Sequence, residues 1–194
     1  MDVRIRSEWL RTLARTTRGV AAREGEVSVR PSIANGASGG AADIGESGLN
    51  VPGAGTKPIR LLLVDDQPAV RRGLRMRFAL ELDLEVVGEA GDAAEAVSLA
   101  QTLRPDVVLM DVDLSGTDGI SAMAALRQVA PRSTVVIFTL YDDVAMRARA
   151  REAGAAAFVA KHQTEEKLLA AIRRAAAERE KEEHEDDMRD GRDR

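Results

Sequence analysis

Apolar residues between positions 59 and 177 of this chain follow two alternating patterns. Short continuous apolar runs are typical of strands buried on both faces of a parallel sheet. Stretches with apolar residues every three or four positions are typical of amphipathic helices. The predicted strands cover residues 59–64, 84–90, 106–110, 134–138 and 155–160. The predicted helices run from Pro68 to about Leu80, from Ala93 to Leu103, from about Ile120 to before Pro131, from Asp142 to Ala153, and through Leu168 to Ala175.

Local signals support these boundaries. Pro68 stands where a helix begins, a position that needs no backbone N–H. Asp92 is followed three residues later by Glu95, as in a capping box, and Gly154 follows the fourth predicted helix. Strands and helices alternate strictly, five times over. Short right-handed connections then predict an α/β domain, a single parallel sheet with helices on both faces, at residues 59–177.

The residues before this domain have a different character. Within residues 1–24, Ile5, Trp9 and Leu13 are four apart among several arginines, which fits a basic amphipathic arm that meets a partner or an anionic membrane. A frayed terminal arm is the preferred interpretation, and a transit peptide or a start codon chosen too far upstream stays open. Residues 25–58 are rich in Gly, Ala, Ser and Pro and are predicted to be a flexible linker.

Composition limits the functional classes. Of the 194 residues, 44% are hydrophobic but only five are aromatic, so the core must be built from Val, Leu, Ile and Ala. The absence of cysteine excludes disulfides and thiolate metal sites and is consistent with a reducing compartment. No apolar run approaches the ~20 residues of a membrane span. The net charge of -4 gives no global basic excess that would indicate nucleic-acid binding.

The charge is distributed unevenly along the chain. Residues 1–58 have a net charge of +2, residues 59–177 of -2, and residues 178–194 of -4. The last segment is predicted to be either a solvated extension of the final helix or an acidic tail, with no function assigned to it.

Polar side chains stand at the carboxyl ends of four predicted strands. Asp65 and Asp66 follow the first strand, Asp111 the third, Thr139 ends the fourth, and Lys161 follows the fifth. The carboxyl ends of parallel strands meet at one edge of a sheet, where open α/β sheets bind ligands. Three carboxylates held together favour a bound cation, and oxygen-only ligands indicate a hard ion such as Mg²⁺.

This set of groups fits transfer of a phosphoryl group to a carboxylate. One Asp would attack phosphorus, while the lysine and a metal ion would neutralise the phosphoryl oxygens and the threonine would donate a hydrogen bond. Taken alone, the motif around Asp111 favours a functional role over the alternative of an Asp that only caps the following helix. No phosphate-binding loop, dinucleotide fingerprint or Ser-His-Asp set competes with this interpretation, and His162 and His184 are predicted to be surface residues.

The chain resembles the receiver domain of bacterial two-component response regulators over about residues 58–177. The resemblance implies a flavodoxin-like (βα)5 doubly wound parallel sheet with strand order 2-1-3-4-5. Val87-Gly88-Glu89-Ala90 and Thr139-Leu140-Tyr141-Asp142-Asp143 are most similar to the subfamily that usually carries a C-terminal helix-turn-helix. The motifs that carry the family resemblance are Val64-Asp65-Asp66, Pro105-Asp106-Val107-Val108-Leu109-Met110-Asp111, Asp118-Gly119, Phe138-Thr139 and Lys161.

The family implies roles for the acidic residues. Asp111 would be the phosphoacceptor. Asp66, Asp111 and the backbone carbonyl of Asp113 would bind Mg²⁺ directly, and Asp65 would bind it through water. Asp113 also adds an acid at the rim, where it could attract a cation or slow the approach of an anionic donor.

Other positions would respond to the phosphoryl group. Thr139 and Lys161 would hold it, and Phe158 matches the aromatic switch position, where the ring turns inward when Thr139 moves. Plain core packing of Phe158 is compatible with that role. Tyr141 could partly cover the pocket and alter the lifetime of the phosphate. Ser115 stands where the family usually has Pro, so we expect a looser loop after Asp111.

The resemblance also implies partners and a setting. The phosphodonor would be a histidine kinase or a phosphotransfer protein in the cytoplasm, and the chain would be a signalling protein rather than an enzyme. No helix-turn-helix follows the last helix, so we expect no nucleic-acid binding by this chain and an output through protein contact. The contact would use the fourth helix, fifth strand and fifth helix, at residues 142–153, 155–160 and from about 168. A homodimer is left open.

Two other functions remain as alternatives. The chain could be a DNA-binding transcriptional regulator that lacks its output domain. It could also be a hydrolase with an aspartyl-phosphate intermediate, for which Asp113 would supply the general acid two residues past the nucleophile. The Asp65-Asp66 pair and the absence of a cap domain favour the receiver.

Overall fold

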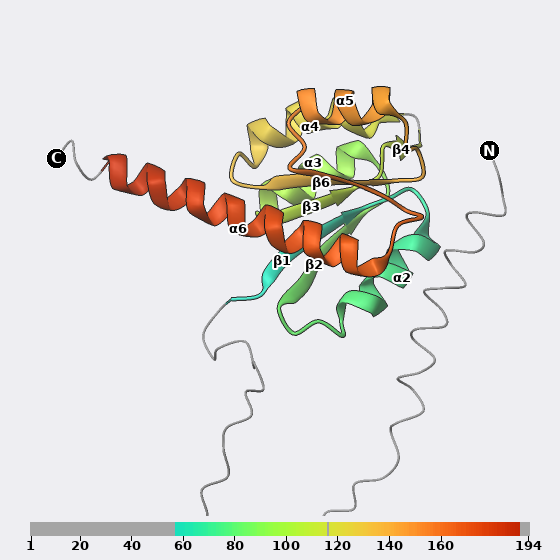
Figure 1. The fold of residues 1–194 in the computed structure, drawn as a ribbon, viewed down its shortest axis with the longest axis horizontal. Helices are drawn as coiled ribbons and strands as arrows, with labels where there is room; N and C mark the ends of the chain where they lie inside the picture. The colour runs from blue at the N-terminus through green and yellow to red at the C-terminus, as the bar shows by residue number, and fades with distance from the viewer. Residues whose placement is uncertain (1–56, 116, 191–194) are drawn as a thin grey trace, which may run out of the picture.

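A computed structural model describes residues 57–115 and 117–190, and its centre is a five-stranded parallel sheet (Figure 1). The strands are ordered β2-β1-β3-β6-β7. Counted along the sheet strands alone, this is the predicted order 2-1-3-4-5, so the predicted flavodoxin-like topology is confirmed. The strands are β1 (Ile59–Val64), β2 (Leu84–Ala90), β3 (Val107–Met110), β6 (Thr134–Thr139) and β7 (Ala157–Ala160).

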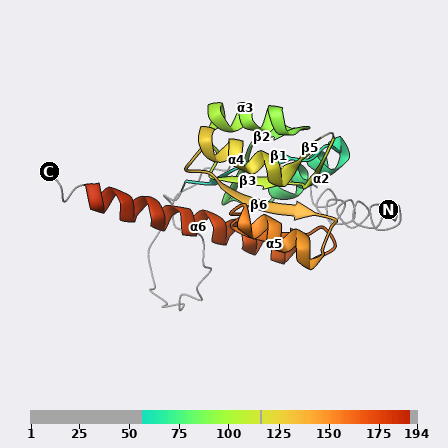
Figure 2. The same ribbon diagram turned by 90° about the horizontal axis from the view of Figure 1, so that it is seen from above.

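Helices cover both faces of the sheet (Figures 1 and 2). Two hydrophobic clusters lie on opposite sides of the strands, and β1 contributes Leu62 and Val64 to one and Leu61 and Leu63 to the other. The first cluster is covered by α3, α4 and α5, and the second by α2 and α6. The helices are α2 (Pro68–Phe78), α3 (Ala93–Leu103), α4 (Gly119–Val129), α5 (Val144–Glu152) and α6 (Glu165–Asp190).

Side-chain caps fix where three of these helices begin. The carboxylate of Asp92 accepts a hydrogen bond from the Glu95 N–H (2.8 Å), and Glu95 in turn accepts from the Gly91 N–H (2.7 Å). The reciprocal bond therefore reaches one residue further back than in an ordinary capping box. Asp118 accepts a hydrogen bond from the Ile120 N–H at the start of α4, and Asp143 accepts one from the Met146 N–H at the start of α5. Each cap follows directly on a loop from the carboxyl edge, so it also fixes the geometry of that edge.

Relative to the sequence prediction, the structure adds a hairpin and decides between the two alternatives for the last helix, while α5 and β7 begin two residues later than predicted, at Val144 and Ala157. A two-residue hairpin, β4 (Asp113–Leu114) and β5 (Thr117–Asp118), lies between β3 and α4. Helix α6 continues to Asp190, so between an extension of the last helix and an acidic tail the structure has the extension. The predicted arm at 1–24 and the linker at 25–58 lie outside the described residues, except for Lys57 and Pro58.

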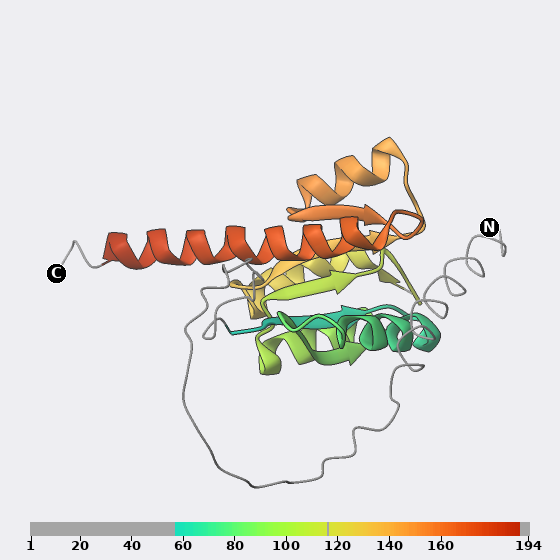
Figure 3. The ribbon, with the colours of Figure 1, turned by 60° about the horizontal axis from the view of Figure 1, so that its bottom comes forward.

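Helix α6 extends beyond the end of the sheet in all three ribbon views (Figures 1, 2 and 3). Its first half carries buried Leu168, Leu169 and Ile172, whereas the second half is almost entirely charged. The helix is long, but its charge is too high for a membrane span. Within residues 57–115 and 117–190, no helix combines the length and the apolar character needed to cross a membrane.

Candidate functional site

Lys161 lies at the centre of the carboxyl edge of the sheet. Its Nζ donates hydrogen bonds to Asp65 Oδ2 (2.5 Å) and to Asp111 Oδ2 (2.6 Å). All three side chains are at most 5% exposed. The residues come from the ends of β1, β3 and β7, which the parallel sheet brings together as predicted. A single buried ammonium group therefore bridges two buried carboxylates.

Burial raises the pKa of the Asp65 carboxyl. The positive charge and hydrogen bond of Lys161 act in the opposite direction, and the nearby Asp111 carboxylate adds a smaller upward effect. Asp65 Oδ1 also accepts a hydrogen bond from the Gln67 N–H at 2.9 Å. Desolvation outweighs these favourable contacts because two carboxylates share one cation in a site that excludes water.

Asp66 is positioned differently from its neighbour. Its Oδ2 accepts a hydrogen bond from the Ser115 hydroxyl at 2.9 Å, which links the loop after β1 to the loop after β3. Its Oδ1 is buried, and no hydrogen bond reaches it from the described residues. A buried carboxylate oxygen without a donor is an available ligand for a hard cation.

The acidic side chains do not form a ready metal site in this arrangement. Within the described residues, no three His, Asp or Glu side chains are grouped closely enough to hold a metal ion. Lys161 occupies the position between Asp65 and Asp111. The donor chemistry still suits Mg²⁺: among the described residues, no donor reaches Asp66 Oδ1, and Asp111 Oδ1 accepts one long bond, from the Asp113 N–H at 3.2 Å.

Asp111 is held by backbone contacts on both sides. Its N–H donates to the Val64 carbonyl of β1 at 2.9 Å. On the other side, the Gly119 N–H donates to the Val112 carbonyl at 2.9 Å. A Cβ atom at Gly119 would collide with the backbone oxygen of Asp111. The glycine thus lets the first turn of α4 pack directly against the backbone of the predicted phosphoacceptor.

Thr139 and Tyr141 close a second side of the site. Thr139 is fully buried at the end of β6, and its Oγ1 accepts a hydrogen bond from the Tyr141 N–H at 3.3 Å. The Tyr141 hydroxyl donates to Asp113 Oδ2 at 3.4 Å, and the ring is 38% exposed. Tyr141 therefore spans the rim of the site from the β6 loop to the β3 loop, consistent with the predicted partial cover.

Phe158 lies on β7 between the core and the surface. It is partly buried and packs against the cluster under α3, α4 and α5. The guanidinium of Arg147 lies over its ring, 4.6 Å from the ring centre, and Arg147 also pairs with Asp142. His162 is about half exposed, with its Nε2 3.5 Å from Asp142 Oδ2, and His184 is also exposed, so both surface predictions are confirmed.

Three contacts of this site were not predicted from the sequence. They are the Ser115–Asp66 hydrogen bond, the Arg147–Phe158 contact and the close approach of Gly119 to Asp111. The first two join side chains from separate loops or elements, and no periodicity signals such pairs. Gly119 stands directly after an Asp in a loop, and that signal could have indicated a close backbone approach.

A family model described as the response regulator receiver domain matches residues 61–173. The transcriptional regulatory protein YxjL of Bacillus subtilis is 39% identical over 118 residues, covering 61% of this chain and 54% of that protein. The nitrate/nitrite response regulator NarP of Escherichia coli is 38% identical over 119 residues, covering 61% of this chain and 55% of NarP.

A solved structure is similar as well. The crystal structure of a two-component response regulator of the LuxR family from Aurantimonas sp. SI85-9A1 superposes with a TM-score of 0.60 at 38% identity. The superposition covers 62% of this chain and 86% of the other. The chain spans about half the length of the curated relatives it matches.

Proposed function

Because the chain belongs to the response regulator receiver domain family, we propose that it accepts a phosphoryl group on Asp111 from a histidine kinase or a phosphotransfer protein of a two-component system. The single observation that carries the proposal is the buried Lys161 ammonium, 2.5 Å from Asp65 and 2.6 Å from Asp111. A carboxylate nucleophile beside a fixed cation and a buried threonine matches the needs of in-line phosphoryl transfer.

In the proposed reaction, an oxygen of Asp111 forms a bond to phosphorus while the bond from phosphorus to the donor's imidazole nitrogen breaks. The Oδ1 atom is suited to attack, because Lys161 holds Oδ2 and, within the part of the chain that the structure describes, the Asp113 N–H alone reaches Oδ1. Lys161 then pairs with the phosphoryl oxygens, and Thr139 moves its hydroxyl from the Tyr141 N–H toward them. The product is an acyl phosphate with up to two added negative charges.

Receiver domains typically bind Mg²⁺ at their acidic pocket. In this chain Asp66, Asp111 and the backbone carbonyl of Asp113 would hold the ion, with Asp65 acting through water. The buried Oδ1 of Asp66 supports this assignment, because no hydrogen bond from the described residues reaches it and a cation could bind it. When bound, the ion would neutralise charge on the transferring phosphoryl group.

We also propose where phosphorylation is passed on to a partner protein. The contact surface is formed by α5, β7 and α6, where the positions of Phe158 and Tyr141 would change when Asp111 is phosphorylated. Inward rotation of Phe158 would require release of its ring from Arg147. The partner at this surface is a protein, the setting is the cytoplasm, and the chain acts as a signalling protein.

Intact mass spectrometry tests the central step. Full-length protein is incubated with acetyl phosphate and Mg²⁺, and one added phosphoryl group is expected, labile to base and to hydroxylamine. Asp111→Asn should show no such gain, and EDTA should suppress it in the wild type. Asp143→Asn is the matched control, because Asn at this exposed helix cap can accept the same hydrogen bond from the Met146 N–H. A wild type that gains no labile phosphate contradicts the proposal.

A transcriptional role is the second candidate, since YxjL is described as a transcriptional regulatory protein. A gel-shift assay with phosphorylated chain separates the two outputs, and binding of a defined DNA by this chain would favour the transcriptional one. Steady release of phosphate from organic phosphate esters would instead favour the hydrolase.

A further inference from the structure

Arg71 is a largely buried arginine at the carboxyl edge of the sheet, and the proposed phosphoryl transfer gives it no role. It lies near the start of α2, and its side chain is 17% exposed. Its Nη1 donates a hydrogen bond to the backbone carbonyl of Asp65 at 2.5 Å. Its Nε is buried and makes no hydrogen bond within residues 57–115 and 117–190. Burying a guanidinium costs free energy, so its contact with Asp65 calls for an explanation.

Glu89 of β2 supplies the counter-charge for this arginine. Its Oε2 lies 3.4 Å from the Nε of Arg71, and its Oε1 lies 3.4 Å from the Nε of Arg75. Arg75 is one turn further along α2 and its side chain is 61% exposed. One carboxylate therefore pairs with two arginines of the same helix, but Arg71 is the one that also reaches the loop after β1.

The backbone of Asp65 is held from two sides. Its N–H donates to the Ala90 carbonyl of β2 at 3.1 Å, and its carbonyl accepts the hydrogen bond from Arg71. This carbonyl belongs to the peptide unit that joins Asp65 to Asp66. Because a peptide unit is planar, holding its oxygen also restricts the position of the Asp66 Cα atom. Arg71 thus acts on the point from which the Asp66 side chain starts.

Asp66 is the residue for which this restriction has a consequence. Its Oδ2 accepts the hydrogen bond from the Ser115 hydroxyl, whereas its buried Oδ1 receives no hydrogen bond from the described residues. The proposed function assigns this Oδ1 atom to Mg²⁺. The position of a ligand oxygen that no donor holds depends on the backbone behind it and on the contact of its sister oxygen.

We propose that Arg71 is a positioning residue for Mg²⁺: by holding the Asp65 carbonyl it sets the Asp66 carboxylate in place for the ion. The inference rests on the proposed function. The charge of Arg71 has the opposite effect, since a cation beside the site repels Mg²⁺. Removal of the guanidinium should therefore weaken binding of the ion if positioning dominates and strengthen it if charge dominates. The sign of the change separates the two roles.

An NMR titration of the full chain with Mg²⁺ measures this sign through the amide shifts of Asp66 and Asp111. Arg71→Ala should raise the dissociation constant of Mg²⁺ by about tenfold, as is typical when a group that orients a metal ligand is removed. Arg71→Lys keeps the charge but loses the planar fork, so its dissociation constant should lie between those of the wild type and Arg71→Ala. At saturating Mg²⁺, the rate at which acetyl phosphate modifies Asp111 should stay within about twofold of the wild type, because only binding of the ion is impaired.

Arg75→Ala is the matched control. It removes the same charge from the same helix and the same partner, Glu89, but it leaves the contact between Arg71 and Asp65 in place. Its dissociation constant for Mg²⁺ should be unchanged or slightly lower, because one repelling charge is gone. In the metal-free protein, the amide shift of Asp66 should change in Arg71→Ala and not in Arg75→Ala.

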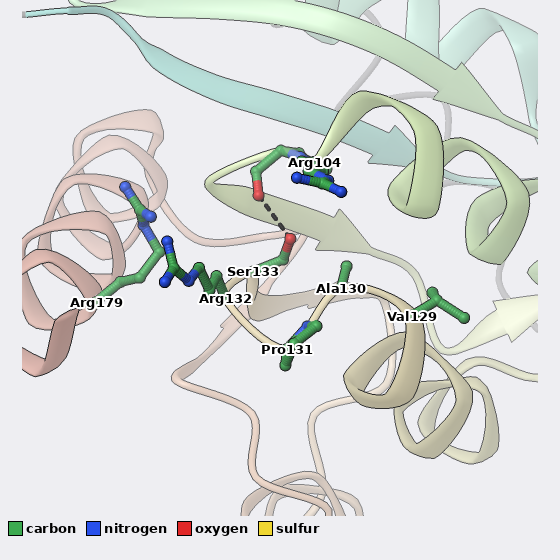
Figure 4. A pocket seen from close by; sticks show the side chains of 8 residues that line it. Arg104, Val129, Ala130, Pro131, Arg132, Ser133 and Arg179 are labelled. Atoms are coloured by element: carbon green, nitrogen blue, oxygen red, sulfur yellow. Dashed lines mark hydrogen bonds between the residues drawn. The ribbon is translucent and has the colours of Figure 1, made fainter. Parts of the chain in front are cut away.

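A second control lies at the opposite edge of the sheet. The loops that precede β3 and β6 form a pocket of about 600 Å³ there, and Arg104, Arg132 and Arg179 are among the residues that line it (Figure 4). Arg104 is exposed, and Arg104→Ala lowers the net charge by the same amount as Arg71→Ala does. Affinity for Mg²⁺ should be unchanged in this variant, which excludes an effect of net charge alone.

Unfolding midpoints in EDTA show whether each variant is folded. The inference is overturned if folded Arg71→Ala binds Mg²⁺ as tightly as the wild type or more tightly, or if Arg75→Ala weakens binding to the same extent. If Arg71→Ala does not fold, Arg71→Lys decides, and an unchanged or lower dissociation constant overturns the inference. In each of these cases, phosphorylation of wild-type Asp111 would still support the proposed function. A wild type that neither binds Mg²⁺ nor gains a phosphoryl group would contradict both.

Discussion

At the scale of single residues, Lys161 balances only one of the two carboxylates that it contacts. Asp65 and Asp111 are both buried, and among the described residues they share this one cation. Burial consequently raises the pKa of Asp65 in spite of the lysine. A bound cation would therefore stabilise the folded site, whereas two ionised carboxylates that share only Lys161 destabilise it.

Asp65→Asn should therefore stabilise the metal-free domain at pH 7. Because the pKa of Asp65 is raised in the folded state, the protonated side chain contributes fully to stability below the pKa of the unfolded chain, near 4. This contribution is lost as the pH rises through the folded-state pKa. The Asn carbonyl can still accept the hydrogen bond from Lys161. Urea unfolding in EDTA should give the variant a higher free energy of unfolding at pH 7, and the difference should shrink as the pH falls toward 4. An unchanged difference across this range would contradict the prediction.

Gly119→Ala should destabilise the domain by about 1–3 kcal/mol. The added methyl group would meet the backbone oxygen of Asp111, which the sheet holds in place. Gly91→Ala is the matched control, because its Cβ would meet only side-chain atoms at 3.7 Å, an ordinary contact. Thermal unfolding of the two variants is the measurement. Equal losses in both would mean that the approach of α4 to Asp111 is not tight.

Much of the candidate site could be predicted from the sequence because the end of each predicted strand shows where the following residue must lie in a parallel sheet. Asp65, Asp111 and Lys161 each follow a continuous apolar run, and a parallel sheet must place them at one edge. The structure brings these three together. The Ser115–Asp66 contact could not be predicted, because it depends on how two loops fold relative to each other.

At the scale of elements, the pattern predicted the sheet strands and their helices well, because buried parallel strands and amphipathic helices have different periods. The β4–β5 hairpin was missed, since a pair of two-residue strands has too few positions to show an alternation. The length of α6 was left open for a related reason. Past Ala176 the helix buries little, so its sequence lacks the apolar period that marks the first half.

Arg173 fixes α6 to the loop between α2 and β2. It donates to both oxygens of Asp83 (2.7 and 2.8 Å) and to Glu81 (2.7 Å). The hydrogen bond from Arg173 lowers the pKa of Asp83. For Glu81, burial opposes ionisation, but hydrogen bonds from Arg77 and Arg173 outweigh it and lower its pKa too. The cluster therefore contributes stability only while both carboxylates are ionised.

Arg173→Gln should lower the free energy of unfolding at pH 7 by about 1 kcal/mol, because the arginine is partly exposed and its pairs are screened. Because the pKa values of Asp83 and Glu81 are lowered in the folded state, their pairing with Arg173 stabilises the fold above the pKa of the unfolded carboxyls, near 4. This stabilisation is lost as the pH falls through the lower pKa values of the folded state. Urea titrations at pH 7 and pH 3.5 should thus show wild type and variant converging at the lower pH. Arg174→Gln is the control, since Arg174 is exposed and makes one pair of 3.4 Å with Glu178. If Arg174→Gln lowered the free energy of unfolding as much as Arg173→Gln, the stabilising role of the Arg173 cluster would be contradicted.

At the scale of the whole molecule, charge is separated between the two edges of the sheet. Acidic residues collect at the carboxyl edge around Lys161, and arginines line the pocket at the opposite edge. This arrangement follows from the topology, since loops before and after the same parallel strands must lie at opposite edges.

Mg²⁺ should stabilise the whole domain through the carboxyl edge alone. A ligand that binds only the folded state adds about 1.4 kcal/mol at ten times its dissociation constant, so the wild type should unfold at higher urea in Mg²⁺ than in EDTA. Asp66→Ala should abolish this shift, because it removes the buried oxygen that no hydrogen bond reaches. Asp143→Asn should keep the shift, since that helix cap lies outside the proposed ligand set. An equal Mg²⁺ shift in Asp66→Ala would mean that the ion binds elsewhere, whatever the outcome for phosphorylation of Asp111.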